Sequence, residues 1–209
     1  MIGAIMLSMS TYPRQKQRYH HGDLRAALTQ AAAALLEERG VRGVTLREAA
    51  RRAGVSHGAP YRHFAGREAL LAELARDGFA RLAAALNAAA PRGGRAVARA
   101  YIHFALAQPD RFRLMFALAA GARRAEAWRD TLQDTTRAFA RAFSDLAEAQ
   151  DAQRAAAAAW SLVHGLAQLL LDGHLGAATG DGSADERFVD DVLGALRFSL
   201  RAHASRLTA

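Results

Sequence analysis

The histidines are the first residues to consider for chemistry, and their spacing does not form a metal or catalytic site. His103, His164 and His174 include no pair at close ligand spacing on one helix with a supporting carboxylate. The chain has no cysteine, which removes disulfides, thiolate ligands and cysteine nucleophiles and fits a reducing cytosol. It also has no glycine-rich phosphate loop and no set of nucleophile, base and orienting group. We therefore expect no metal, no cofactor and no catalytic residue.

The charge of the chain suits a polyanion as its partner. The 209 residues carry a formal net charge of +8, and most of the basic excess lies in residues 1–90. Basic side chains that neutralise phosphates release condensed counterions, which favours binding to nucleic acid. An arginine-rich composition is the alternative explanation, because Lys16 is the only lysine.

The segment from Thr45 to Phe64 has the start and stop signals of two short helices. Thr45 and Glu48 form a capping-box pattern, in which each side chain satisfies a free backbone amide of the other residue. Gly54 lies in a tight turn after the first helix, and Ser56 can cap the second. Two short helices joined in this way make a helix-turn-helix, whose second helix enters the major groove of DNA.

The second of these helices has one apolar face. Pro60 and Phe64 lie four residues apart, so they share a face that can pack against the preceding helices. Gly58, Ala59 and Arg62 then point away from that core. The helix therefore has an inner face for packing and an outer face for contact with a partner.

The stretch from Val44 to Phe64, with Arg-Glu-Ala-Leu-Leu at 67–71, closely resembles TetR-family transcriptional regulators, and Tyr-Arg-His-Phe at 61–64 is its most specific part. At motif level the resemblance covers about residues 19–75. It implies a regulator that binds a palindromic operator as a homodimer, most often a repressor released by a small molecule. Pro60 stands where the family usually has an aliphatic residue. Because proline lacks an amide and crowds the first turn, we expect the recognition helix to start late.

The resemblance implies that bases are read from two places. Arg47 is placed to reach a guanine edge through two hydrogen bonds, His57 can donate to a base, and Ala59 can meet a thymine methyl. Gly58 lets the backbone approach the DNA closely. Arg62 faces outward, and the alternatives of base contact and simple solvation stay open for it.

The phosphate contacts implied by the resemblance are Thr45, Ser56, Tyr61, His63 and Arg67. Helix N-termini at Thr45, Ser56 and Arg67 would add oriented backbone amides. Thr45 and Ser56 have a simpler alternative role as helix caps, and Tyr61 has one as a packed ring.

Composition predicts an all-α protein, because strong helix formers dominate and no long run alternates like a strand. The first helix should begin near Leu24 and end at Gly40. About nine helices are expected in total, and those after residue 66 should occupy 67–89, 94–107, 109–119, 123–149, 151–173 and 185–206. We expect a disordered basic leader at 1–18, the helix-turn-helix domain at 19–66 and an effector-binding and dimerisation domain at 67–209. The leader segment 14–21 either follows the minor groove or makes no fixed contact.

The C-terminal helices have the composition of a mostly apolar small-molecule cavity with few polar anchors. The candidates for ligand binding are His103, Phe104, Phe112, Met115, Phe116, Trp128, Phe139, Trp160 and His164. Ordinary helix core is the alternative for any one of them. The run from Trp160 to Gly165 also resembles a motif of one TetR subgroup, in which the glycine permits close helix approach.

The last two helices carry apolar stripes that would be costly if exposed on a monomer. The resemblance implies that both helices pair with their copies in a four-helix dimer interface. Its candidate residues are Val163, Ala167, Leu170, Leu171, Phe188, Val192, Leu196 and Leu200. Packing within one chain is the competing explanation.

The rival to a DNA-binding regulator is a helical enzyme or small-molecule carrier whose basic charge is incidental. Such a protein would use the histidines with Asp110, Asp130 or Asp172. The apolar stretch 1–7 has no signal-peptide pattern, and polar residues interrupt the uncharged stretch 155–171. We therefore expect a cytoplasmic protein whose partners are duplex DNA, its own copy and an unknown effector.

Overall fold

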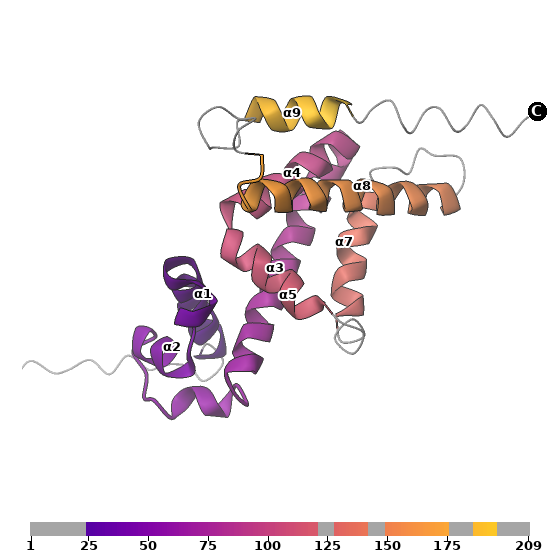
Figure 1. The fold of residues 1–209 in the computed structure, drawn as a ribbon. Helices are drawn as coiled ribbons and strands as arrows, with labels where there is room; N and C mark the ends of the chain where they lie inside the picture. The colour runs from indigo at the N-terminus through magenta and orange to yellow at the C-terminus, as the bar shows by residue number, and fades with distance from the viewer. Residues whose placement is uncertain (1–23, 121–127, 142–148, 176–185, 196–209) are drawn as a thin grey trace, which may run out of the picture.

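The structure is a computed structural model that describes residues 24–120, 128–141, 149–175 and 186–195 (Figure 1). Within these residues the chain forms eight α-helices, two short 3-10 helices and no strand, which confirms the all-α prediction. In chain order the elements are α1 (Leu24–Gly43), α2 (Leu46–Arg52), η1 (Ala59–Arg62), α3 (Arg67–Ala89), η2 (Ala90–Arg92), α4 (Gly94–Ala107), α5 (Pro109–Ala119), α7 (Arg129–Arg141), α8 (Ala149–Leu171) and α9 (Glu186–Ala195).

The helices expected at 67–89, 94–107 and 109–119 coincide with α3, α4 and α5. The expected spans 123–149 and 185–206 extend beyond the described residues, and so do the leader 1–18, Leu196 and Leu200. α8 begins two residues before its expected span. No described helix is long and apolar enough to cross a membrane.

The N-terminal unit is formed by α1, α2, η1 and the start of α3. α1 is interrupted at Gly40, whose φ of 65° lies in the left-handed region that favours glycine. Leu28, Leu35, Leu46 and Phe64 form its core and are at most 5% exposed. The apolar face predicted for the recognition segment therefore packs inward as expected.

The predicted capping box at α2 is only half formed. The Thr45 side chain accepts a hydrogen bond from the Glu48 amide at 3.1 Å, as predicted. The Glu48 carboxylate instead accepts hydrogen bonds from Arg39 at 3.1 Å and from Arg51 at 2.5 Å. The two guanidiniums lower the pKa of Glu48, with the Arg51 hydrogen bond the largest cause. The reciprocal half of the prediction was wrong because charge-assisted bonds to arginine compete with the backbone amide.

α3 joins the N-terminal unit to the C-terminal helices. Its 23 residues span about 35 Å at 1.5 Å per residue. It packs against α1 near its beginning and against α5, α7 and α4 further along (Figure 1). Leu70, Leu74, Leu82 and Leu86 are fully buried along one face. A displacement of the C-terminal helices can therefore reach the N-terminal unit through one rigid element.

The C-terminal helices form a bundle in which α8 packs across α4 and α7, while α5 packs against α3. α9 lies on α4 (Figure 1). Val163 and Ala167 of α8 are at most 2% exposed within this bundle. One face of α8 is therefore core of a single chain.

Candidate nucleic-acid interface and ligand cavity

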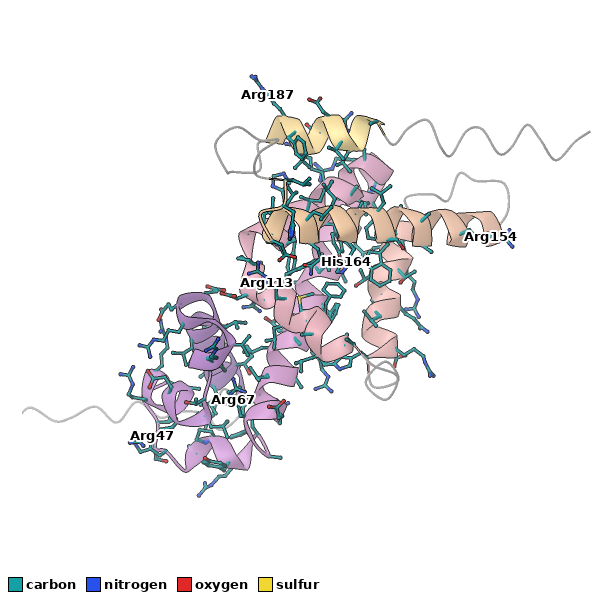
Figure 2. All side chains as sticks on the ribbon, in the orientation of Figure 1. Arg47, Arg67, Arg113, Arg154, His164 and Arg187 are labelled. Atoms are coloured by element: carbon teal, nitrogen blue, oxygen red, sulfur yellow. The ribbon has the colours of Figure 1, made fainter. Side chains whose placement is uncertain are left out.

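Arg47 is exposed on the outer edge of the N-terminal unit (Figure 2). It is the second residue of α2, two positions after the N-cap Thr45. Its guanidinium forms no hydrogen bond or ion pair with the described residues, unlike Arg51 and Arg52 of the same helix, which pair with Glu48 and Glu38. Arg47 thus keeps all its donors for a partner outside the chain.

The recognition segment is one turn of 3-10 helix rather than a longer helix capped by Ser56. η1 begins at Ala59, its N-cap is Gly58, and no side chain caps it. Ser56 contributes its carbonyl, which accepts from the Ala59 amide at 3.0 Å. Pro60 is buried and lies within the first two positions of η1, where its missing amide costs nothing. The late start predicted from Pro60 is confirmed, whereas the predicted cap at Ser56 was wrong.

The outer side of this turn is polar and exposed. Ser56, His57, Gly58 and Arg62 are exposed, and Ala59 is half-buried. The Tyr61 side chain is 65% exposed, so its ring is not packed in the core. Most of the side chains predicted to contact DNA from η1 and the residues before it are therefore exposed to solvent.

His63 and Phe64 close the recognition turn against α1. The His63 carbonyl accepts a hydrogen bond from Arg25 at 3.4 Å, and the Arg25 guanidinium lies 5.0 Å from the centre of the Phe64 ring. Arg25 in turn pairs with Glu73 of α3 at 2.7 Å. The Glu73 carboxylate raises the pKa of Arg25, chiefly through this hydrogen bond. The half-buried His63 is thus held in place from the backbone side.

Arg67 points into the N-terminal unit rather than toward the outer face (Figure 2). Its Nε donates to the Val44 carbonyl at 2.8 Å, and its Nη2 donates to the Val41 carbonyl at 2.6 Å. Carbonyl groups at the C-terminal end of a helix lack donors within the helix. Arg67, at the start of α3, supplies such donors at the end of α1. The available sequence signal for this role was an arginine at the first position of α3. The carbonyls that it binds belong to the segment that follows Gly40.

A partly buried group of polar side chains lies between α4 and α8. The Tyr101 hydroxyl lies 2.9 Å from His164 Nδ1 and accepts a hydrogen bond from Trp160 Nε1 at 3.2 Å. Trp160 and His164 were predicted as ligand-binding residues, but Tyr101 was missed. The sequence gives no local signal for it, because its partners lie 59 and 63 positions away.

These contacts assign the tautomer of His164. The indole nitrogen can only donate, so the Tyr101 hydroxyl accepts from it. Tyr101 is fully buried, and an unsatisfied hydroxyl proton there would cost roughly 1–3 kcal/mol. The hydroxyl therefore donates to Nδ1, which leaves the proton of a neutral imidazole on Nε2. Burial lowers the pKa of His164 and so favours the neutral ring. Burial also raises the pKa of Tyr101, which keeps its hydroxyl protonated.

A cavity of about 380 Å³ adjoins this polar group. It is lined by Phe116, Ala119, Ala120, Leu132, Trp160, Ser161 and His164. His164 lines the cavity, and its Nε2 has no hydrogen-bond partner among the described residues. The Ser161 hydroxyl donates to the Ala157 carbonyl at 2.8 Å. The cavity therefore has mostly apolar walls and one imidazole in its lining.

The other predicted ligand residues divide into core and surface. Phe112, Met115 and Phe139 are at most 1% exposed, and the Phe112 and His164 ring centres lie 5.6 Å apart. Phe104 and Trp128 are at most 8% exposed and do not line this cavity. His103 is exposed and faces a different hollow, on the outer side of α4.

Two family descriptions match the chain. Residues 28–74 match "Bacterial regulatory proteins, tetR family", and residues 95–196 match "Tetracyclin repressor-like, C-terminal domain". The chain belongs to the TetR family. TetR-family membership makes it a DNA-binding transcriptional regulator.

Solved structures agree with this TetR-family assignment. A protein of unknown function from Rhodococcus sp. RHA1 is 40% identical, with a TM-score of 0.63 over 87% of this chain and 95% of that chain. A bacterial regulatory protein of the tetR family from Rhodococcus RHA1 is 25% identical, with a TM-score of 0.53 over 69% of this chain and 83% of that chain. A transcriptional regulator (TerR/AcrR family) from Aquifex aeolicus VF5, 15% identical, shares the fold with a TM-score of 0.58 over 83% of this chain and 97% of that chain. No curated protein matches the chain.

A buried charged contact connects the cavity-lining α5 of this TetR-family chain to its N-terminal unit. Arg111 of α5 is 2% exposed, and its Nη1 donates to Asp77 of α3 at 2.6 Å. Its Nη2 lies 3.5 Å from Glu37 of α1. Arg111 Nε has no partner among the described residues although it is buried. α5 is thereby tied to both α3 and α1.

The residues predicted for a TetR-type dimer interface lie at different depths. Val163 and Ala167 are core residues of the single chain, whereas Leu170, Leu171, Phe188 and Val192 are half-buried. The large apolar side chains that α8 exposes are Leu162, at 41%, and Leu169, at 45%, neither of which was predicted from the sequence. Their spacing of seven residues places them on one helix face, which is the signal that could have found them. A Cβ at Gly165, between them, would meet no described atom within 4 Å.

Proposed function

We propose that this regulator is a homodimeric repressor that binds a palindromic operator and releases it when a small molecule fills the cavity. The observation that carries the proposal is the arrangement of three parts. An exposed polar edge lies at the N-terminal unit, a cavity lies in the C-terminal bundle, and α3 with the buried Arg111 contact joins the two. An effector that displaces α5 would then move α3 and α1 together. Effector and DNA would weaken each other's binding by the same factor.

On the DNA side, Arg47, His57 and Ala59 are proposed to read bases, with Gly58 allowing close approach. Arg47 carries most of this expectation because it is exposed and has no partner among the described residues. Arg62 is proposed to extend the same surface.

Thr45, Ser56, Tyr61 and His63 are proposed to contact phosphates and so fix the register. Arg67 is proposed to act on DNA binding indirectly, because its guanidinium binds two backbone carbonyls of the N-terminal unit. It would hold the start of α3 in place for the residues that do make contact.

The dimer is proposed to form through the exposed face of α8 together with α9. Leu162 and Leu169 support this, because they lie on one face with Gly165, where a partner helix can approach closely. Twofold symmetry would match two recognition turns to the two halves of a palindrome.

The operator proposal is tested by fluorescence anisotropy with the promoter region of the protein's own gene and a random duplex at equal salt. We expect binding to the promoter at least about a thousand times tighter than to the random duplex. Arg47→Ala should weaken promoter binding by roughly tenfold or more, from the loss of one bidentate base contact. Arg137→Ala, which removes an exposed arginine of α7 61% accessible to solvent, is the control. Equal affinity for both duplexes would refute the proposal.

The effector is proposed to be an uncharged, mostly apolar molecule that carries a hydrogen-bond acceptor. This follows from the apolar walls and from the Nε2–H that His164 offers to the cavity. The test compares 2-acetylnaphthalene with 2-isopropenylnaphthalene, which replaces the carbonyl oxygen with a methylene group. The ketone should bind about fivefold more tightly, the effect of one neutral hydrogen bond. Tyr101→Phe frees the tautomer of His164 and should reduce this preference. Equal binding of the two probes would refute the acceptor requirement and leave the DNA-binding role intact.

A further inference from the structure

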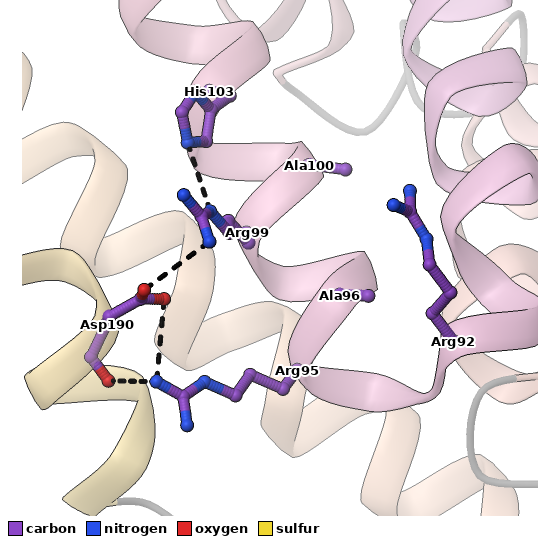
Figure 3. Close-up of a pocket in the computed structure, with 7 residues that line it drawn as sticks. All are labelled: Arg92, Arg95, Ala96, Arg99, Ala100, His103 and Asp190. Atoms are coloured by element: carbon purple, nitrogen blue, oxygen red, sulfur yellow. Dashed lines mark hydrogen bonds and ion pairs between the residues drawn. The ribbon is translucent and has the colours of Figure 1, made fainter. Parts of the chain in front are cut away.

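A second hollow, of about 520 Å³, lies on the outer face of α4 and is strongly basic (Figure 3). Its lining consists of Arg92, Arg95, Ala96, Arg99, Ala100, His103 and Asp190. On α4, Arg95, Arg99 and His103 lie four residues apart, and Ala96 and Ala100 follow beside them with the same spacing, so these residues share one helix face. Tyr101, whose ring contacts Phe112 and Phe139, is buried on the opposite side of α4. This hollow is therefore separate from the ligand cavity.

The described side chains of this hollow carry more positive than negative charge. Among the described residues that line it, three guanidiniums accompany one carboxylate, that of Asp190 on α9. Arg95 Nη2 donates to the Asp190 backbone carbonyl at 2.9 Å and lies 3.5 Å from its carboxylate. Arg99 Nη1 lies 3.4 Å from the same carboxylate (Figure 3). Arg92 is exposed and has no hydrogen bond or ion pair with the described residues. Among the described residues, the Asp190 carboxylate is thus shared by Arg95 and Arg99, while Arg92 pairs with none of them.

The shape of the hollow suits a small ligand. The small side chains Ala96 and Ala100 lie between Arg92 and the two arginines that extend toward Asp190 (Figure 3). The N-terminus of α4 begins at Gly94, and the preceding Gly93, with φ of 89°, turns the chain so that Arg92 faces the same hollow. Guanidiniums bind carboxylate and phosphate groups through paired N–H donors, which gives both affinity and geometry.

We propose that this hollow binds a small metabolite carrying carboxylate or phosphate groups, held by Arg92, Arg95 and Arg99. The Asp190 carboxylate occupies part of this site and competes with the ligand for Arg95 and Arg99. The ligand displaces it and thereby loosens the contact of α9 with α4. The site lies at the end of α3 opposite the N-terminal unit, so it provides a second input to the regulator, independent of the apolar cavity.

The test is isothermal titration calorimetry of the full chain with citrate and with inorganic phosphate, each against chloride at the same ionic strength. At least one of the two oxyanions should bind saturably, once per chain, and the tighter one identifies carboxylate or phosphate as the preferred group. Arg95→Gln should weaken binding by roughly tenfold or more, since a charged hydrogen-bonding partner is lost. Arg137→Gln removes the same charge from an exposed position on α7 and should change binding by less than about twofold.

The Asp190→Asn variant distinguishes an oxyanion-binding site from a purely structural ion pair. It removes the internal competitor, so the oxyanion should bind several times more tightly than in the wild type. Three results would each overturn the proposal. These are no oxyanion binding above that of chloride, equal weakening by Arg95→Gln and Arg137→Gln, and unchanged or weaker binding in Asp190→Asn. None of these results depends on whether the protein binds its operator.

Discussion

The buried contact between Arg111 and Asp77 should respond unequally to the removal of its two partners. Arg111 is 2% exposed, whereas the Asp77 side chain is 34% exposed. Asp77 has a second partner, Arg81, at 2.7 Å, so it stays paired when Arg111 is removed. When Asp77 is neutralised, the carboxylate left to Arg111 among the described residues is that of Glu37, which lies 3.5 Å away and is 57% exposed. The two single variants thus leave different charges behind.

The expected magnitudes follow from what each variant leaves behind. Asp77→Asn leaves a guanidinium that is buried and poorly compensated, which costs about 3 kcal/mol in the free energy of unfolding. Arg111→Met keeps much of the side-chain volume and removes the buried Nε that lacks a partner among the described residues. Its cost should be about 1 kcal/mol or less, because replacing a buried charge by an apolar group of similar size is often nearly neutral. The difference between the variants is therefore about 2 kcal/mol.

The assay is urea unfolding followed by circular dichroism at fixed protein concentration, since dimer formation would make stability concentration-dependent. Thermal unfolding provides a second measurement: at about 2–4 °C per kcal/mol for a chain of this size, Asp77→Asn should lower Tm by roughly 6–12 °C. The double variant Asp77→Asn with Arg111→Met should recover most of this loss. If Arg111→Met were as destabilising as Asp77→Asn, or if the double variant were the least stable of the three, the reasoning would be refuted.

Three further predictions concern packing, pH and assembly. Gly78→Ala would bring a Cβ to 2.6 Å from the Met115 sulfur in a fully buried contact between α3 and α5. We expect it to destabilise the protein by about 1 kcal/mol or more, despite the better helix propensity of alanine. Thermal unfolding measures this change. Because burial lowers the pKa of His164 below 6.5, the unfolded state binds more protons below that pH. The contribution of this residue to stability is therefore fully present above pH 6.5 and is lost as the pH falls through the folded-state pKa. In urea unfolding, the unfolding free energy of a His164→Gln variant should fall less steeply with decreasing pH than that of the wild type. An unchanged dependence on acidic pH would contradict this prediction. Leu169→Glu, alone or with Leu162→Glu, places charge on the exposed face of α8 and should convert the proposed dimer to a monomer. Analytical ultracentrifugation measures this change, and a dimer that persists would place the interface elsewhere.

Local signals in the sequence were sufficient for most of the fold. Alanine-rich composition and apolar periodicity predicted an all-α chain, and Gly and Pro punctuation placed α3, α4 and α5 at their observed bounds. The cap at Thr45 and the late start caused by Pro60 were also predicted, because each depends on residues within four positions. Such features follow from backbone geometry that neighbouring residues decide.

The roles of side chains that bridge distant parts of the chain were decided only by tertiary structure. Arg67 fitted the family's pattern of phosphate contacts, yet its guanidinium binds carbonyls 23 and 26 positions earlier. Tyr101 was not selected at all, although it orients His164 from 63 positions away. His103 was placed with the aromatic residues of α4, but it lies on the outer face with the arginines. Periodicity shows that a residue belongs to a helix face, whereas packing of the helices determines what that face meets.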